Sequence, residues 1–277
     1  KVLKNENITN DDLIVHMLGR KLETMFPEKR HLNSKQEVLR VENLTTDKVK
    51  DISFVLYKGE ILGMVGLVGS GRTELVKALY GMEKIHSGKI FINGKEVSIK
   101  SPRDSIRHGM FMAPEDRKGE GIVPERSVKE NITYSKLFHF TKFGIIRKKK
   151  EKAHAEKMKQ DIHIKAPDIE ALSGNLSGGN QQKVVVAKAL TANPEILLFD
   201  EPTQGIDVGA KAEIYELIHQ MAEEGVAILV ISSEMEEAIG ISKRLLIMRE
   251  GKLTGEIAEE IQDRKKILDF MYRSDGK

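Results

Sequence analysis

Continuous apolar runs alternate with an amphipathic segment in the second half of the chain. Residues 196–199, 226–231 and 245–248 are short runs of this kind, and residues 210–221 have the apolar spacing of a helix. Runs of this length without polar alternation are typical of strands that are buried on both faces, and intervening helices connect parallel neighbours. This pattern predicts an α/β fold with a parallel-sheet core.

The first half of the chain predicts a different arrangement. Its expected strands are short: residues 38–41, 52–57, 61–65, 90–92 and 97–99. A helix is expected over residues 102–108, where Pro102 suits the first helical position. From about 127 to 171 the chain loses strand character and becomes Lys-rich and helical, most strongly over residues 151–159. We therefore expect an N-terminal β region, and then a helical insert before the sheet resumes.

A glycine-rich loop follows the apolar run 61–65. It consists of Gly66, Leu67, Val68, Gly69, Ser70, Gly71, Arg72 and Thr73. The spacing fits the phosphate loop G-x-x-x-x-G-K-[ST], in which backbone N–H groups surround phosphates and a hydroxyl reaches Mg²⁺. Such a turn alone is often only a tight turn, but Leu75, Val76 and Leu79 continue as one helix face, as the motif requires. Arg72 departs from the motif, because a planar guanidinium does not freely replace a compact ammonium.

Two further motifs carry chemistry suited to phosphates. Ser177, Gly178 and Gly179 open a helix and present a hydroxyl and unobstructed N–H groups at its positive end. Taken alone, Ser-Gly-Gly is more often a capped helix start. Asp200 and Glu201 follow the buried run 196–199; adjacent acids at a strand end are more often a solvated turn. Phosphoryl transfer needs one carboxylate near the metal and a second that positions or activates the water.

Together these motifs resemble those of ATP-binding cassette (ABC) ATPases. The resemblance rests on the glycine loop, on Leu176-Ser177-Gly178-Gly179-Asn180 with Gln181-Gln182, and on Phe199-Asp200-Glu201-Pro202-Thr203. It implies a P-loop NTPase cassette with a parallel-sheet core, an N-terminal antiparallel β region and a helical subdomain that carries the signature motif. It also implies ATP with Mg²⁺ held by Thr73 and Asp200, and a water that Glu201 polarises. In this family the signature contacts ATP held by a second cassette, towards which the turn of Asp207 also crosses.

Four positions on the Walker side depart from the family pattern. Arg72 replaces the lysine of the loop, Glu115 stands where a glutamine is expected, and Ser233 stands where the switch histidine is expected. No aromatic residue lies between Leu44 and Val49, where the family usually stacks a ring on adenine. The signature side is intact. The simplest interpretation is a degenerate Walker-side site paired with a competent signature.

This pattern is similar to the second cassette of ribose- and galactose-type sugar importers, whose two cassettes share one polypeptide. The resemblance extends over about residues 38–252 and rests on the sequences Gly69–Glu74, Pro114–Lys118 and Gly205–Lys211. It implies that this cassette supplies the signature half of the strong site. Its implied partners are the N-terminal cassette of the same polypeptide or a second copy, transmembrane permease subunits and, indirectly, a periplasmic or lipoprotein sugar-binding protein. The implied location is peripheral, at the cytoplasmic face of the cell membrane.

The composition excludes several other classes of protein. Lys and Arg number 45 against 42 Asp and Glu, so the net charge of +3 does not indicate a nucleic-acid partner. The run Arg147–Lys150 could contact lipid headgroups or nucleic acid, although a solvated helix face is the preferred interpretation. The absence of cysteine excludes disulfides and thiolate metal sites, and no His or carboxylate cluster has metal-ligand spacing. No apolar run approaches the roughly 18 residues of a membrane span, so we expect membrane attachment to come through a partner.

Three segments are expected along the chain. They are residues 1–36, the tail of a preceding cassette with a linker; residues 37–256, the nucleotide-binding domain, with its helical subdomain at about 127–172; and residues 257–277, a C-terminal helix. The first assignment rests on the spacing of Leu13, Ile14 and Met17 after a possible helix cap at Asn10, which residues 267–271 repeat. Two unrelated amphipathic helices would show the same spacing.

Three functions are compatible with these motifs. The leading hypothesis is an energy-coupling subunit in which ATP closes two cassettes and hydrolysis reopens them. A second is a nucleotide-gated scaffold that binds nucleotide without hydrolysing it. A third, a soluble ABC ATPase of DNA repair or translation, would normally show coiled-coil heptads or strongly basic arms, and neither is present. The cargo stays open among pentose, hexose and nucleoside.

Overall fold

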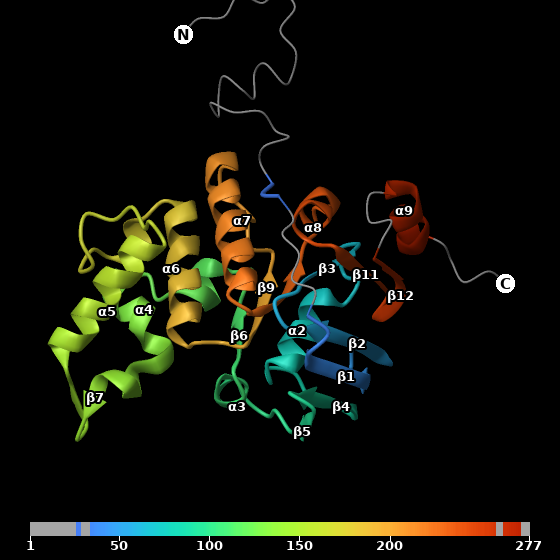
Figure 1. The fold of residues 1–277 in the computed structure, drawn as a ribbon, viewed down its shortest axis with the longest axis horizontal. Coiled ribbons are helices and arrows are strands. Elements are labelled where there is room, and N and C mark those ends of the chain that lie inside the picture. Colours follow the sequence, from blue (N-terminus) through green and yellow to red (C-terminus); the bar gives the residue numbers. More distant parts are fainter. Residues whose placement is uncertain (1–25, 29–33, 259–262, 273–277) are drawn as a thin grey trace, which may run out of the picture.

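The computed structural model describes residues 26–28, 34–258 and 263–272, and a six-stranded mixed sheet runs through its centre (Figure 1). In spatial order its strands are β12 (Lys252–Ile257), β11 (Arg244–Arg249), β3 (Ile61–Gly66), β10 (Ala227–Ile231), β9 (Ile196–Asp200) and β6 (Met110–Ala113). All neighbours are parallel except β12, which pairs antiparallel with β11. The predicted parallel-sheet core is confirmed. The edge strand β12 was not predicted.

A second, antiparallel sheet lies beside the first. Its order is β2 (Ile52–Tyr57), β1 (Glu37–Thr45), β4 (Ser87–Ile92) and β5 (Lys95–Val97), which confirms the expected N-terminal β region. The strand expected over residues 97–99 is wrong in position. Asn93 and Gly94 both have positive φ, 50° and 74°, and form a tight hairpin turn, so β5 begins directly after them and ends at Val97.

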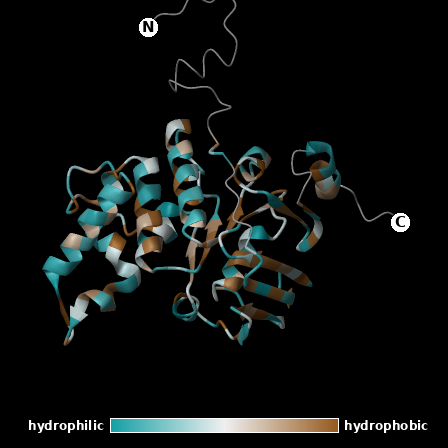
Figure 2. Ribbon diagram, in the orientation of Figure 1, coloured by the Kyte–Doolittle hydropathy of each residue, from teal (hydrophilic) through white to brown (hydrophobic). Residues whose placement is uncertain are grey.

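Helices cover both faces of the six-stranded sheet (Figure 1). The helices of the described chain are α2 (Arg72–Leu79), α3 (Pro102–Arg107), α4 (Val128–Thr133), α5 (Lys148–Asp161), α6 (Gly178–Thr191), α7 (Val208–Glu223), α8 (Met235–Ile241) and α9 (Arg264–Tyr272). Of these, α4 and α5 pack beside α6 rather than on the sheet. Successive residues of a strand point to opposite faces. Leu198 of β9 therefore packs in a core with α2 and the antiparallel sheet, while Phe199 packs in a second core with α6 and α7. Figure 2 shows the central strands as the most hydrophobic part of the ribbon.

The insert between β6 and α6 is mainly helical, as expected. It contains α4, a 3-10 segment (Tyr134–Phe140) and α5. It also contains a small hairpin that the sequence pattern does not predict, formed by β7 (Thr141–Lys142) and β8 (Ile145–Ile146). The predicted helix after Asn10 lies outside the described residues.

Candidate nucleotide site

The glycine loop is a tight connection between β3 and α2. Gly71 lies directly before α2 with a φ of 97°, a left-handed conformation that favours glycine. A Cβ atom on Gly66 would lie 2.4 Å from the Met248 carbonyl oxygen and 2.5 Å from Ser70 Oγ. Only glycine fits there, because the loop lies directly against the end of β11. The backbone is thus held as a narrow turn at the start of a helix, the arrangement that cradles phosphates.

A buried carboxylate lies beside this loop. Asp200 is the last residue of β9 and is 1% exposed, and its Oδ1 accepts a hydrogen bond of 3.2 Å from Thr73 Oγ1. Burial raises the pKa of Asp200 to about 7, against the opposing effect of the Thr73 hydrogen bond. The other oxygen, Oδ2, and the hydroxyl of Ser70 are both buried and accept or donate no hydrogen bond within the described chain. Buried polar atoms of this kind normally have a partner, and hard oxygen donors are those that Mg²⁺ prefers.

The described residues contain no group of three or more His, Cys, Asp or Glu side chains that could hold a metal ion. Thr73 and Asp200 supply only two oxygen ligands. A divalent cation at this position would therefore need ligands from elsewhere, such as phosphate oxygens and water.

Arg72, Glu201 and Ser233 form one network at the ends of β9 and β10. Arg72 Nη1 donates to the Ser232 carbonyl and lies 3.7 Å from Glu201 Oε1. Ser233 Oγ donates to the other oxygen, Glu201 Oε2, at 3.0 Å. The Arg72 and Glu201 side chains are only 8% and 10% exposed. Burial lowers the pKa of Arg72 and raises that of Glu201, while their mutual attraction opposes both shifts. Two of the residues that depart from the family pattern, Arg72 and Ser233, are thus engaged with the second carboxylate.

Glu115 belongs to the same electrostatic cluster, although it is exposed. Its negative charge raises the pKa of Arg72, in opposition to the effect of burial, and it also raises the pKa of Asp200. Its Oε1 accepts a hydrogen bond of 3.0 Å from Gln204 Nε2. A neighbouring contact was not predicted from the sequence: Arg117 donates to the carbonyls of Gln204 and Gly205. Two loops, one after β6 and one after β9, are tied together by these bonds.

The signature residues lie at the start of α6. Ser177 is exposed and precedes the first helical residue, and its Oγ accepts a hydrogen bond of 2.8 Å from Asn180 Nδ2. Gly179 is buried, and a Cβ there would lie 2.5 Å from the Cβ of Ala210 in α7. Its absent side chain therefore lets two helices approach closely, a role that the sequence analysis did not anticipate. Asp207 has a structural role within this chain, since its Oδ1 caps α7 by accepting from Ala210 N at 3.0 Å.

The glycine loop and the signature are separate half-sites in this chain. Among the described residues, no hydrogen bond or ion pair joins residues 177–179 to residues 66–73 or to Asp200. Each of the two presents groups suited to a phosphate.

A family model described as "ABC transporter" matches residues 49–204, which include the glycine loop, the signature and both carboxylates. The chain belongs to the ABC transporter family. Among solved structures, an ATP-binding cassette of an ABC transporter covers 86% of this chain and 99% of its own length, with a TM-score of 0.74 and 21% identity. At that identity the likeness shows the fold alone, and it confirms the predicted ABC cassette of the P-loop NTPase class.

Similar curated proteins have names that refer to sugar import. A putative ribose/galactose/methyl galactoside import ATP-binding protein of Halalkalibacterium halodurans is 45% identical over 266 residues, 96% of this chain and 51% of that protein. The arabinose import ATP-binding protein AraG of Mannheimia succiniciproducens is 46% identical over 265 residues, 94% of this chain and 52% of that protein. The chain thus spans about half the length of these relatives. Within its described residues no helix is long and apolar enough to cross a membrane.

Proposed function

We propose that this chain is an energy-coupling cassette of a sugar-uptake ABC transporter. Its signature motif would complete the ATP site of a partner cassette, while its own Walker-side site is degenerate. The sugar-import relatives support the class of cargo. The proposal of a degenerate site rests on the ion pair between Arg72 and Glu201. This pair engages the Glu201 carboxylate, which is the group that would act on water.

The site retains the groups needed to bind ATP with Mg²⁺. Backbone N–H groups of residues 66–73 and the Ser70 hydroxyl would contact the phosphates, and Thr73 and Asp200 would hold the cation. Mg²⁺ would neutralise phosphate charge and would bind the buried Asp200, whose Oδ2 has no hydrogen-bond partner within the described chain. Binding ATP and hydrolysing it have different requirements, and these residues meet the requirements for binding.

The residues of this site meet the requirements for hydrolysis poorly. A carboxylate positions or activates water best when its oxygens are free to accept that water's proton. Glu201 instead accepts from Ser233 and faces the Arg72 guanidinium, so both of its oxygens are engaged within the chain. Arg72 also donates to the Ser232 carbonyl, which directs its charge towards β10. We propose that these contacts make Glu201 a weak positioner of water.

The signature side has no comparable obstruction. Ser177 is exposed, and its hydroxyl remains able to donate a hydrogen bond while it accepts one from Asn180. The N–H groups of Gly178 and Gly179 lie in the first turn of the 14-residue helix α6, where four N–H groups have no helical partner. This surface can receive the γ-phosphate of a nucleotide bound elsewhere. We propose that this nucleotide is bound by the N-terminal cassette of the same polypeptide or by a second copy of this chain.

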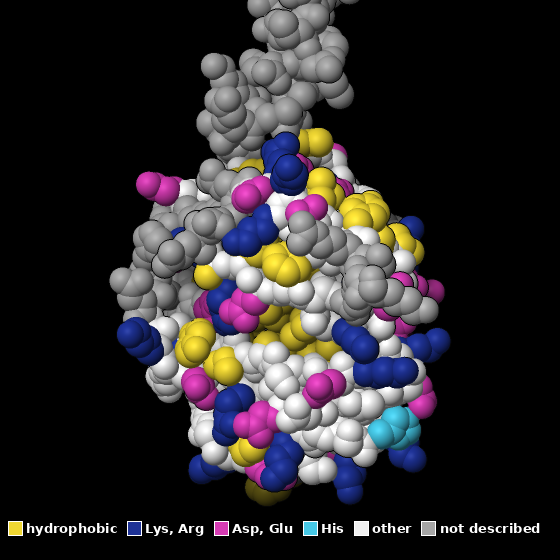
Figure 3. All heavy atoms as spheres, turned by 90° about the vertical axis from the view of Figure 1, so that its right-hand side faces the viewer, with side chains coloured by type: hydrophobic (Ala, Val, Ile, Leu, Met, Phe, Trp, Pro, Cys, Tyr) yellow, Lys and Arg dark blue, Asp and Glu magenta, His cyan; other side chains and the backbone are white. Residues whose placement is uncertain are grey.

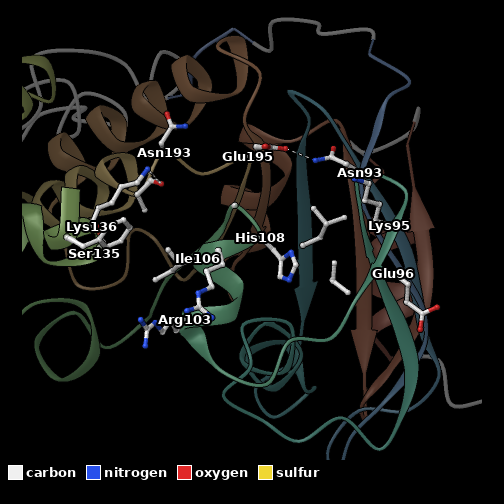
Figure 4. Close-up of a pocket in the computed structure, with 16 residues that line it drawn as sticks. Asn93, Lys95, Glu96, Arg103, Ile106, His108, Ser135, Lys136, Asn193 and Glu195 are labelled. Atoms are coloured by element: carbon white, nitrogen blue, oxygen red, sulfur yellow. Dashed lines mark hydrogen bonds between the residues drawn. The ribbon is translucent and has the colours of Figure 1, made fainter. Parts of the chain in front are cut away.

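We propose that the membrane partners are permease subunits, with a sugar-binding protein acting indirectly, and that the cassette is peripheral at the cytoplasmic face of the membrane. A groove with a volume of about 1020 Å³ lies between β5, α3 and the beginning of the helical insert (Figure 4). The basic residues Lys95, Arg103, Arg107 and Lys136 line it, together with the acids Glu96 and Glu195. Asn93 donates to Glu195 at 2.7 Å. Its predominance of cations suits a permease segment with acidic side chains.

Two alternatives have specific tests. A non-hydrolysing regulatory cassette would share the Arg72–Glu201 pair but would not need a functional signature. A nucleoside importer would differ only in cargo. Uptake of radiolabelled ribose, arabinose and a nucleoside by the complete transporter in proteoliposomes separates these outcomes. The proposal predicts ATP-dependent uptake of a sugar that Ser177→Arg abolishes, with Lys58→Gln as a control at an exposed lysine remote from the signature. Nucleoside uptake, or sugar uptake that survives Ser177→Arg, would overturn it.

A further inference from the structure

The β7–β8 hairpin carries an exposed aromatic ring at its tip. Phe143 and Gly144 form the two-residue turn, and both have positive φ, 52° and 79°. Asn, Asp or Gly is the usual choice for such turns, since bulky side chains rarely adopt positive φ. The Phe143 residue is 92% exposed, so the fold of this chain gains almost no burial from it. Neither the turn nor the core of the described chain accounts for a phenylalanine here.

Other exposed apolar side chains lie close to Phe143 along the chain. Ile145 is 73% exposed and Ile146 is 38% exposed, and Phe138, at the end of the preceding helical segment, is 66% exposed. Figure 2 shows the hairpin as a hydrophobic projection next to the hydrophilic start of α5. Exposed apolar residues that occur singly need no explanation, but a cluster on one projecting element indicates a contact surface.

Cations lie immediately behind the apolar tip. Lys142, Arg147, Lys148, Lys149 and Lys150 are all exposed, and residues 141–150 include no acidic residue. Glu151, the first acid after them, is buried and accepts a hydrogen bond of 3.0 Å from Thr133. The cations therefore have no acidic neighbour along this segment. On the face that Figure 3 shows, by contrast, basic and acidic side chains are interspersed.

Two of these cations also fix the base of the hairpin. Arg147 and Lys150 donate to the carbonyl of His139, at 3.2 Å and 3.3 Å. Lys148 and Lys149, in the first turn of α5, form no such bond to the hairpin. The element thus presents an ordered apolar tip, a fixed base and two cations available to a partner.

We infer that the β7–β8 hairpin is a membrane-contact element, which places Phe143 and Ile145 in the interface of a bilayer and its lysines among anionic headgroups. An apolar tip backed by cations is the distribution that binds an anionic interface, where rings enter the boundary region and lysines reach phosphates. A protein-binding surface would more commonly surround such a tip with a polar rim of both acidic and basic residues. The charge pattern alone favours a solvated helix face for Arg147–Lys150, because it does not reveal the exposed tip beside this run.

The position of the hairpin agrees with this inference. In Figure 1 it projects at the lower edge of the molecule, the same edge as α3 and β5, which line the groove proposed for the permease. The inference goes beyond the proposed function, since no residue of the nucleotide site takes part. Loss of vesicle binding would therefore leave ATP binding intact, and loss of ATP binding would leave vesicle binding intact.

Co-sedimentation with vesicles tests the inference on the purified chain. One set of vesicles is phosphatidylcholine alone, and the other contains about 30% phosphatidylglycerol. Phe143→Asn removes the ring and retains a residue that tolerates positive φ, so the turn is preserved. Lys148→Gln with Lys149→Gln removes two exposed cations. Lys50→Gln with Lys58→Gln is the matched control, because it removes the same charge from exposed positions in the antiparallel β region.

We expect binding to the anionic vesicles only, and weaker binding as salt is raised. Loss of two cations should weaken that binding about thirty-fold, and Phe143→Asn should weaken it about tenfold. The control pair should bind as the unchanged chain does. Equal binding to both kinds of vesicle, no binding to either, or equal loss in the control pair would overturn the inference. Binding that appears only with a permease subunit, and not with lipid, would assign the hairpin to a protein partner instead.

Discussion

Replacing Gly179 with alanine tests the packing role of the signature helix. The added Cβ would lie 2.5 Å from the Cβ of Ala210, about 1 Å closer than an ordinary contact. Neither atom is the end of a flexible side chain, so α6 and α7 must separate. Overpacking of this kind costs about 1–3 kcal/mol, and the better helix propensity of alanine offsets less than about 1 kcal/mol. We therefore expect a net destabilisation of about 1–2 kcal/mol.

Thermal unfolding of the purified chain measures this effect. For a chain of this size the expected destabilisation corresponds to a fall of about 2–8 °C in the midpoint. Gly178→Ala is the matched control, because its nearest neighbour, the Gly205 carbonyl oxygen, would be 3.2 Å away and the strain is smaller. Ala210→Gly should recover most of the stability lost in Gly179→Ala, as a coupled pair requires. An unchanged midpoint for Gly179→Ala, or no recovery in the double variant, would refute the packing role.

Three further predictions concern the Walker side. The purified chain alone should hydrolyse ATP far more slowly than a complete transporter, and a comparable turnover in a phosphate-release assay would contradict this. The pKa of Asp200 is raised to about 7, so its carboxyl group becomes protonated below that pH. Affinity for Mg²⁺–ATP should therefore fall by up to about tenfold per pH unit as the pH decreases from 7. Asp200→Asn should remove this pH dependence in a fluorescent-nucleotide titration, and its persistence would assign the dependence to another group. In the proposed two-cassette protein, with the Walker site of the other cassette disabled, Arg72→Lys should not restore rapid hydrolysis unless Glu115→Gln and Ser233→His accompany it. Full recovery with Arg72→Lys alone would show that the site is not degraded at several positions.

Much of the fold was predictable because its determinants are local. The buried strands around Leu198 and Ile228 are continuous apolar runs, and the loop at Gly66 is defined by glycine spacing. The strand β12 was missed because it has Gly255 in its middle and polar residues along its length, so it forms no apolar run. Its place is set by pairing with β11 across the tight turn at Glu250 and Gly251, where both residues have positive φ. The β7–β8 hairpin was missed for a related reason, since its two-residue strands are too short to show a period.

The candidate site was predictable in its residue types but not in its contacts. Motif spacing names Arg72, Glu201 and Ser233, yet 128 positions separate the first two and only the sheet brings them together. The bonds from Arg117 to the loop after β9 and the approach of Gly179 to α7 are likewise long-range. Side-chain direction and helix separation depend on packing across the whole fold, and no local pattern encodes them.

The central claim is that this cassette contributes through its signature and little through its own carboxylate. The most direct test compares Ser177→Arg with Glu201→Gln in the ATPase activity of the proposed two-cassette protein. Ser177 is exposed, so the arginine should leave the unfolding midpoint unchanged and act only on the phosphate surface. The account predicts that Ser177→Arg lowers turnover by about 10² to 10³, as loss of transition-state phosphate donors does, while Glu201→Gln leaves it largely unchanged. Loss of turnover in Glu201→Gln, with Ser177→Arg active, would contradict it.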